Sequence, residues 1–189
     1  MKLTEKEQQY LLKLARKAMV EFFYRGEKVK IGLSEVPSEN LKKKTACFIT
    51  LTLEGKLRGC IGHIVPIQPL YQAVIDNALS AAYDDPRFFP LCEDELQKVK
   101  IEISVLSLPE QIVASSPAER LEKIVPGQHG VIIQQNGRHA TFLPQVWEKI
   151  PDKQDFLSQL CLKAGLPPTC WQDPQTKIFV YQVQKFQEE

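Results

Sequence analysis

The first hydrophobic pattern in the chain is helical. Apolar residues recur at spacings of three and four from Leu11 to Phe23, as expected for a helix with one buried face. Thr4 and Glu7 stand ahead of this pattern as the two members of a capping box, in which each side chain satisfies a backbone N–H group at the helix start. We therefore predict a helix over about residues 4–23, ending near Gly26.

Two alternating segments follow, Cys47–Leu53 and Lys56–His63, on either side of Glu54-Gly55. Short alternating segments around a glycine-containing turn predict a β-hairpin. The register of this hairpin matters, because a slip of one residue would move every side chain to the opposite face of the sheet.

Two registers are possible for this hairpin. A two-residue loop would place Ile49 opposite Cys60, whereas a three-residue loop would place Ile49 opposite Ile61 and Leu51 opposite Gly59. We favour the three-residue loop because it gathers five apolar residues on one face, each worth roughly 1.5–3 kcal/mol when buried. That apolar face carries Ile49, Leu51, Leu53, Leu57 and Ile61. The opposite face carries Thr50, Thr52, Arg58 and Cys60.

A second helical pattern, rich in alanine, runs from Leu70 to Ala81. Pro69 suits the first turn of a helix, and Pro86 requires the helix to end by Asp85. The alanines predict close packing of this helix against the apolar face of the hairpin.

The rest of the chain alternates between strand and helix patterns. Val99–Val105 alternates as a half-buried strand. The further predicted elements are a short helix from Ser116 to about Ile124, a hairpin of Val131–Gln135 and Arg138–Phe142 around Asn136-Gly137, a short helix from Pro144 to Ile150, a helix over Phe156–Ala164, and a last strand over Lys177–Phe186. Hairpins dominate the strand connections, so we predict an α+β fold with a mixed, mostly antiparallel sheet and packed helices.

Composition limits the possible partners. The chain has 189 residues, of which 43% are hydrophobic and 25% charged, as expected for a soluble globular protein. A net charge of +1 provides no global field for polyanions, so we expect no nucleic-acid partner. The lysines within residues 27–45 leave a nucleic-acid-associated regulator as the weakest alternative. No apolar run reaches the roughly 20 residues of a membrane helix, so we expect no membrane partner.

The cysteine pattern points to a reducing compartment. The five cysteines are odd in number and form no CxxC pair, and the first residues lack the apolar core of a signal peptide. We therefore expect a cytoplasmic protein with reduced thiols. Cys60 and His63 resemble half of a zinc ligand set, but no second pair follows, so we predict no metal. Without a phosphate-binding loop, we predict no cofactor.

The chemistry of the chain is concentrated in Leu57-Arg58-Gly59-Cys60-Ile61-Gly62. Glycine weakens a strand, and its presence marks a bulge or the close approach of a backbone or ligand. A guanidinium near Cys60 would favour the thiolate, which is the nucleophilic form. Arg58 and Cys60 are thus the candidate catalytic residues, and Gly59, Gly62 and Thr50 the candidate binding residues. Three interpretations of Cys60 stay open: a buried small hydrophobe, an ordinary binding residue, or a covalent catalyst.

A cysteine nucleophile normally needs a base. His63 lies three residues after Cys60 and would point to the other face of a strand, and His139 would project from the second hairpin. We therefore keep His129 as the binding candidate that the fold could bring to the site.

The turn after the second helix adds further candidates. Asp85 and Arg87 could form a substrate clamp, because arginine holds carboxylates and phosphates in a bidentate manner. Alternatively, an aspartate and Arg87 pair locally to fix the turn, with Phe88 filling the core. We predict that Asp84 or Asp85 is a partner of Arg58, with a backbone carbonyl as the alternative, and that this turn forms the rim of a concave site.

These motifs together resemble the AMMECR domain family, called protein A of the AmmeMemoRadiSam system in prokaryotes. The residues that carry the resemblance are the 57–62 segment, Ala82-Tyr83-Asp84-Asp85-Pro86-Arg87-Phe88, Ile103-Ser104-Val105-Leu106, Gly130-Val131-Ile132-Ile133 and Thr141-Phe142-Leu143-Pro144-Gln145-Val146. The resemblance implies one AMMECR-type domain over residues 1–189, with a larger and a smaller lobe, and specifies no particular reaction.

The same resemblance implies a role in a shared pathway. We expect a component of an enzymatic or modification pathway, with a pocket for a small molecule or peptide around the 57–62 motif. The implied partners are a Memo-type protein, similar to non-haem iron dioxygenases, and a radical SAM protein. The alternative function is a non-catalytic binding or adaptor module.

Overall fold

The computed structural model describes residues 2–189, which form two compact units. The first unit contains the chain up to Leu106 together with Gln184–Glu189, and the second contains Ser107–Val183. Each unit has its own four-stranded sheet and its own hydrophobic core.

The first unit combines a sheet of order β2-β1-β3-β8 with helices. Its strands are β1 (Cys47–Leu53), β2 (Lys56–Gly62), β3 (Lys100–Leu106) and β8 (Val183–Gln187). Its helices are α1 (Glu5–Arg25), α2 (Glu39–Lys42), α3 (Leu70–Tyr83) and α4 (Glu93–Leu96), with a 3₁₀ turn at Leu33–Glu35. β1 pairs antiparallel with both β2 and β3, and the predicted α+β class is confirmed.

Both predicted ends of α1 are confirmed. The Thr4 hydroxyl accepts a hydrogen bond from the Glu7 N–H, and the Glu7 carboxylate accepts one from the Thr4 N–H. Gly26 ends the helix with a φ of 67°, a left-handed conformation that glycine adopts without strain.

The β1–β2 hairpin has the predicted pairing but not the predicted loop. Ile49 lies opposite Ile61 and Leu51 opposite Gly59, yet Leu53 lies opposite Lys56, so the loop has two residues. A β-bulge at Arg58 reconciles the two observations, because it adds one residue to β2 between Gly59 and the turn.

The bulge also corrects the predicted apolar face. Leu57 lies opposite Thr52, and directly opposed residues project from the same face of a sheet. Leu57 therefore leaves the apolar face and is 46% exposed, whereas Ile49 and Leu51 are fully buried.

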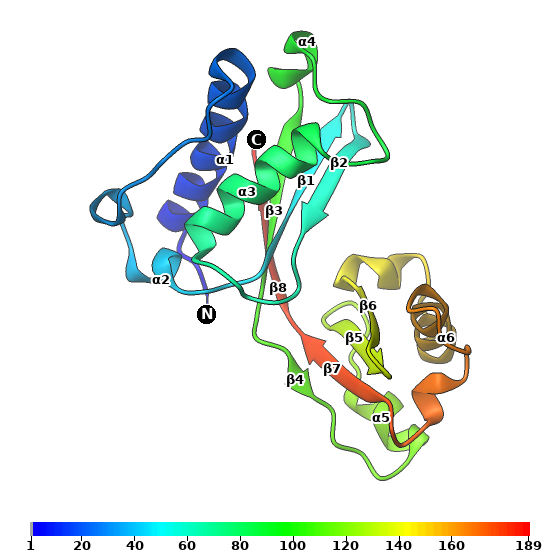
Figure 1. Ribbon diagram of the computed structural model, residues 1–189. Coiled ribbons are helices and arrows are strands. Elements are labelled where there is room, and N and C mark those ends of the chain that lie inside the picture. Colours follow the sequence, from blue (N-terminus) through cyan, green and yellow to red (C-terminus); the bar gives the residue numbers. More distant parts are fainter. Residues whose placement is uncertain (1) are drawn as a thin grey trace. The chain divides into compact units, whose positions relative to one another are not determined.

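Helices α1 and α3 lie side by side over one face of this sheet (Figure 1). The predicted close packing of the alanine-rich helix is confirmed, since Ala78, Ala81 and Ala82 are buried. The contact is close enough that a Cβ atom on Gly59 would lie 2.1 Å from the Ala81 carbonyl oxygen. The core of the first unit therefore lies between the α1–α3 layer and this face of the sheet.

The second unit has a sheet of order β4-β7-β5-β6. Its strands are β4 (Glu110–Gln111), β5 (Gly130–Gln135), β6 (Arg138–Phe142) and β7 (Lys177–Tyr181). Its helices are α5 (Pro117–Lys123) and α6 (Lys153–Lys163), with 3₁₀ turns at Pro144–Glu148 and Cys170–Gln172. Trp147 stacks on the fully buried Phe156 in its core, with ring centroids 3.6 Å apart.

The predicted single last strand is wrong. It is two strands in different sheets, β7 and β8, because the backbone at Gln182 leaves the β7 pairing and bonds Ser107 instead. A two-residue alternation continues through a change of pairing partner, so the sequence pattern did not reveal the break. The two-residue strand β4 is too short to produce a pattern at all.

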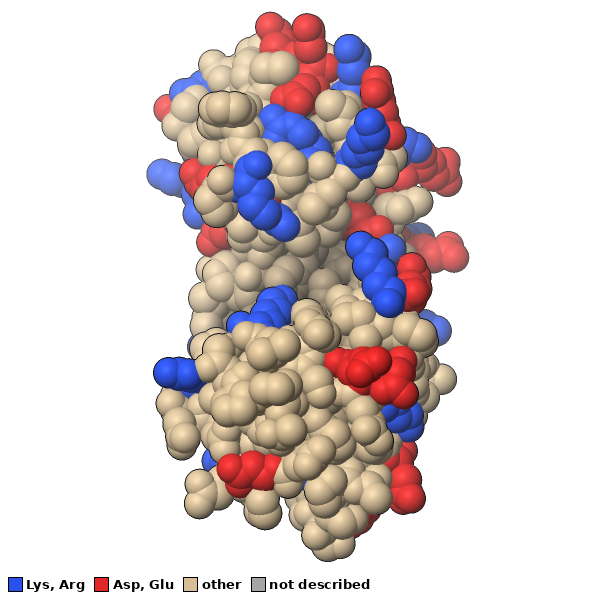
Figure 2. Space-filling view, turned by 90° about the vertical axis from the view of Figure 1, so that its right-hand side faces the viewer, with Lys and Arg blue, Asp and Glu red and all other residues tan. Residues whose placement is uncertain are grey.

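Charges of both signs are mixed on the surface. Figure 2 shows lysine and arginine side chains interspersed with acidic ones over the viewed face, in line with the net charge of +1. None of the helices within residues 2–189 combines the length and the apolar character needed to cross a membrane.

Candidate functional site

The face of the first sheet opposite Leu51 and Gly59 carries a row of polar side chains. Cys60 lies opposite Thr50, and Thr50 lies opposite Glu102 on β3. The Thr50 hydroxyl donates to Cys60 Sγ at 3.4 Å, and Glu102 forms a 2.8 Å ion pair with Lys185 of β8. We call these four residues the polar row; a thiol, a hydroxyl, a carboxylate and an ammonium group thus lie next to one another across four strands.

Arg58 is directed away from Cys60 towards α4. Its Nε and Nη2 atoms donate to the two carboxylate oxygens of Glu95 at 2.7 and 2.8 Å, and Nη2 also donates to the Phe89 carbonyl at 2.9 Å. The prediction of Asp84 or Asp85 as the partner of Arg58 is therefore wrong, while the alternative of a backbone carbonyl is confirmed. The bulge at Arg58 supplies this new direction, since bulges commonly redirect a side chain.

The Arg58–Glu95 pair is well shielded, with side chains 13% and 23% exposed. The bidentate arginine lowers the pKa of Glu95 to about 2, and Glu95 in turn raises the pKa of Arg58. Such charge-assisted pairs are among the stronger hydrogen-bonded contacts in proteins. Arg58 Nη1 is buried without a hydrogen-bond partner. This arginine therefore fixes β2 to α4.

Asp85 and Arg87 hold the main chain of Cys60. The Cys60 N–H donates to Asp85 Oδ2 at 2.8 Å, and Arg87 Nη2 donates to the Cys60 carbonyl at 3.1 Å. Arg87 also donates to both oxygens of Asp85, which holds the pKa of that buried carboxyl group well below its usual range. The local pairing that we kept as an alternative is therefore present, and the pair covers the outer edge of β2.

Arg87, rather than Arg58, is the arginine beside the Cys60 thiol. The pKa of Arg87 is raised chiefly by Asp85, and the Cys60 side chain contributes to the same shift. The ring of Phe88 lies 5.7 Å from the Arg58 guanidinium and 5.5 Å from that of Arg87. The 84–90 turn thus brings one arginine to the thiol and holds the other at α4.

The two glycines of the motif are explained by contacts within the chain. A side chain at Gly59 would collide with the backbone of α3, and one at Gly62 would lie 2.4 Å from the Phe48 ring and 2.5 Å from the Cys47 carbonyl. The close approach that the glycines predicted is therefore made by the protein itself. Their assignment to ligand binding stays a prediction.

His129 belongs to the second unit. Its Nδ1 accepts a hydrogen bond from the Val125 N–H at 3.2 Å, and burial lowers the pKa of the ring. Its carbonyl accepts a 2.7 Å hydrogen bond from Trp147 Nε1. These contacts give His129 a structural role in its own unit, and its role at Cys60 stays a prediction.

Sequence reasoning missed Glu95, Glu102 and Lys185. Glu102 had a local signal, because it alternates with the apolar residues of β3 and therefore had to share a face with Thr50. Glu95 lies 37 residues from Arg58 and gave no local signal. Across residues 2–189, no group of three or more His, Cys, Asp or Glu side chains is arranged to hold a metal ion.

These features define a two-unit α+β protein with a cysteine positioned on a bulged hairpin. The AMMECR1 family matches residues 12–186, and the chain belongs to this family. Protein MK0488 of Methanopyrus kandleri is 42% identical over 196 residues, covering 100% of this chain and 91% of its own. Protein NEQ441 of Nanoarchaeum equitans is 45% identical, covering 95% of this chain and 99% of its own.

A solved structure has the same fold. The crystal structure of the uncharacterized protein PH0010 from Pyrococcus horikoshii superposes with a TM-score of 0.90 at 37% identity. The match covers 100% of this chain and 95% of that chain. These comparisons establish family and fold, and the names of the relatives state no activity.

Proposed function

We propose that this AMMECR-type protein binds a small molecule or a peptide at the polar row, as a component of an enzymatic or modification pathway. The observation that carries the proposal is the placement of Cys60. Its main chain is held by Asp85 and Arg87, while its half-buried side chain contacts Thr50. A group held this firmly before binding loses little entropy when a ligand arrives.

The chemistry of the polar row suits a ligand with both donors and acceptors. Thr50 offers a hydroxyl, Glu102 a carboxylate and Lys185 an ammonium group, and Arg87 is half exposed next to the thiol. Binding sites typically use a few placed polar groups of this kind to orient a ligand. By family association, a Memo-type protein and a radical SAM protein are the partners in the pathway.

Covalent catalysis by Cys60 is the second candidate. It is favoured by the position of Cys60, because its side chain is half-buried and Arg87 bonds its carbonyl, and reactive cysteines lie in partly exposed positions near cations. The only histidine in the first unit is His63, which is exposed. Binding is therefore better supported than a cysteine–histidine mechanism. In the adaptor alternative, the polar row binds a peptide and no reaction follows.

Ligand protection of Cys60 tests the proposal. Iodoacetamide labelling of the native protein, mapped by mass spectrometry, would be timed with and without the small-molecule and peptide fractions of a cell extract. A ligand on the polar row should slow the labelling of Cys60 and leave that of the exposed Cys92 unchanged. Equal Cys60 rates with every fraction would count against the proposal, and loss of protection in Thr50→Val would locate the ligand.

A further inference from the structure

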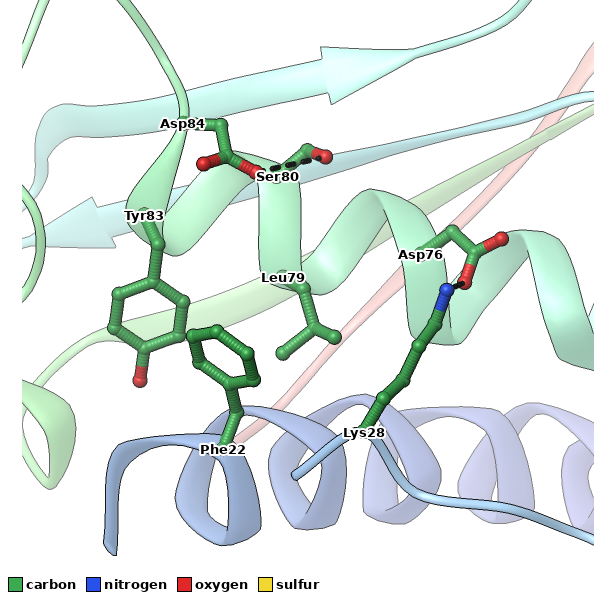
Figure 3. A pocket seen from close by; sticks show the side chains of 7 residues that line it. All are labelled: Phe22, Lys28, Asp76, Leu79, Ser80, Tyr83 and Asp84. Atoms are coloured by element: carbon green, nitrogen blue, oxygen red, sulfur yellow. Dashed lines mark hydrogen bonds and ion pairs between the residues drawn. The ribbon is translucent and has the colours of Figure 1, made fainter. Parts of the chain in front are cut away.

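A separate hollow lies on the helical layer of the first unit. It has a volume of about 290 Å³ and lies between the end of α1, the segment after it and one side of α3. Figure 3 shows Phe22, Leu79 and Tyr83 gathered at its centre, with Asp76, Ser80 and Asp84 along the side of α3. This volume is near the lower end of the range for small-molecule pockets.

The centre of the hollow is apolar and aromatic. The rings of Phe22 and Tyr83 have centroids 5.1 Å apart and an interplanar angle of 39°. The Tyr83 hydroxyl donates to the Met19 carbonyl at 2.9 Å, and burial raises the pKa of Tyr83 to about 12. The tyrosine therefore stays neutral, and its ring and that of Phe22 present π-faces that attract a cation.

The two carboxylates along α3 differ in their partners. Asp76 is saturated by an ion pair with Lys28 and by amide hydrogen bonds from Gln68 and Gln72 at 3.0 and 3.1 Å. Within residues 2–189, Asp84 receives only one side-chain hydrogen bond, from the Ser80 hydroxyl at 3.4 Å. Asp84 is exposed to solvent, and no basic side chain of the described residues pairs with its carboxylate.

Asp84 lies at the C-terminal end of α3, where a negative charge is unfavourable. Asp84 is the C-cap residue of α3, and the last turn of this helix contains no basic residue. The C-terminal end of a helix carries partial negative charge, so a carboxylate there is unfavourable unless a cation is nearby. The next basic residue along the chain, Arg87, is paired with Asp85.

We infer that this hollow binds a small organic ammonium compound. The ammonium group pairs with Asp84 at the C-terminal end of α3, and the apolar part of the compound lies against Phe22, Leu79 and Tyr83. The inference uses none of the polar-row residues and stands independently of the proposed function.

Titration with phenethylammonium chloride tests the inference, with 2-phenylethanol as the neutral probe of similar shape. Binding would be followed through the backbone amide signals of Ser80, Tyr83 and Asp84 by NMR spectroscopy. We expect the ammonium probe to bind about tenfold more tightly than the alcohol, the combined effect of one ion pair and one cation–π contact. Equal affinities, or shifts confined to other residues, would overturn the inference.

Two variants locate the contacts. Asp84→Asn should weaken the ammonium probe by about threefold to fivefold and leave the alcohol unchanged. Asp94→Asn, which makes the same charge change at an exposed position on α4, should leave both affinities unchanged. Phe22→Leu keeps an apolar side chain without the ring and should weaken the ammonium probe by about twofold to fivefold. An Asp84→Asn protein that retains full ammonium affinity would refute the inference.

Discussion

The two hairpins of the molecule turn the chain in the same way but pair their strands differently. Glu54-Gly55 joins β1 to β2 with φ values of 51° and 77°, and Asn136-Gly137 joins β5 to β6 with the same two values. Both are two-residue turns in the left-handed region, as type I′ hairpins require. The turns therefore cannot account for the difference between the hairpins.

The difference lies in the strands. The β5–β6 pairing is uninterrupted, from Val131 opposite Phe142 to Gln135 opposite Arg138. The β1–β2 pairing instead shifts by one residue between Leu51 and Thr52. The shift gives Arg58 its path to Glu95, and the next residues are Gly59 and Cys60. Departures from local regularity tend to mark functional sites. The comparison therefore supports the first hairpin as the one that carries chemistry.

Glycine substitutions are expected to show the largest difference in stability between the two hairpins. A Cβ atom on Gly59 meets the backbone of α3, while one on Gly130 meets the Tyr181 ring at 2.3 Å. A side chain can be shortened but a backbone cannot. Gly59→Ala should therefore destabilise the protein by more than about 4 kcal/mol or abolish folding, measured by urea unfolding.

The matched change in the second hairpin should be rescuable. The double variant Gly130→Ala, Tyr181→Leu should lose less free energy of unfolding than the two single variants lose together, because the shorter side chain makes room for the methyl group. Gly59→Ala combined with Leu51→Ala should show no such rescue. A Gly59→Ala protein that melts near the wild-type temperature would show that α3 can move away from β2.

These contacts also show what the sequence could and could not predict. Both ends of α1 were predictable because Thr4, Glu7 and Gly26 act on their immediate neighbours. The pairing of Ile49 with Ile61 followed from burial, but the bulge did not, since it needs a partner for Arg58 that comes from α4. The glycines pointed to the candidate site, and its role in binding stays a prediction. The arginine that bonds Cys60 is Arg87, which a long connection brings back to β2.

Removing the partner of Arg58 should have the next largest effect. Glu95→Gln leaves a shielded guanidinium without its carboxylate, which should cost about 2–3 kcal/mol at pH 7, somewhat less than a fully buried pair. The pKa of Glu95 is lowered from 4.5 to about 2 in the folded protein. The stability from this pair is therefore complete above about pH 4.5 and lost as the pH falls towards 2.

Urea unfolding of wild type and Glu95→Gln at several pH values measures this loss. The difference in free energy of unfolding between the two proteins should shrink as the pH is lowered from 4.5 to 2. Arg138 in the second hairpin supplies the control, because its guanidinium bonds the Gly165 carbonyl and is exposed. Arg138→Met should cost less than about 1 kcal/mol, with no change over that pH range. A gap in the Glu95→Gln comparison that is independent of pH would contradict the assigned ion pair.

Arg87→Met should lower both the reactivity of Cys60 and the stability of the protein. The Arg87 side chain is 52% exposed, but the Asp85 side chain is only 2% exposed, so loss of the guanidinium leaves a buried carboxylate without its cation. Loss of the guanidinium beside the sulfur should slow the alkylation of Cys60 by roughly threefold, on the scale of one exposed charge contact. Cys47 serves as an unreactive reference, because burial raises its pKa to about 12. An unchanged Cys60 rate would remove Arg87 from the candidate site.

Exchanging the turn residues should have the smallest effect and sharpens the comparison itself. Glu54 adopts a φ of 51°, where asparagine is several times more common than glutamate, and Asn136 already occupies the equivalent position. Glu54→Asn should therefore raise stability by about 0.5 kcal/mol, and Asn136→Glu should lower it by a similar amount, both measured by urea unfolding. If the turns are equivalent, the two changes are equal and opposite. A larger effect in the first hairpin would mean that the turn and the bulge at Arg58 act as one unit, so that the irregular strand pairing extends to the loop.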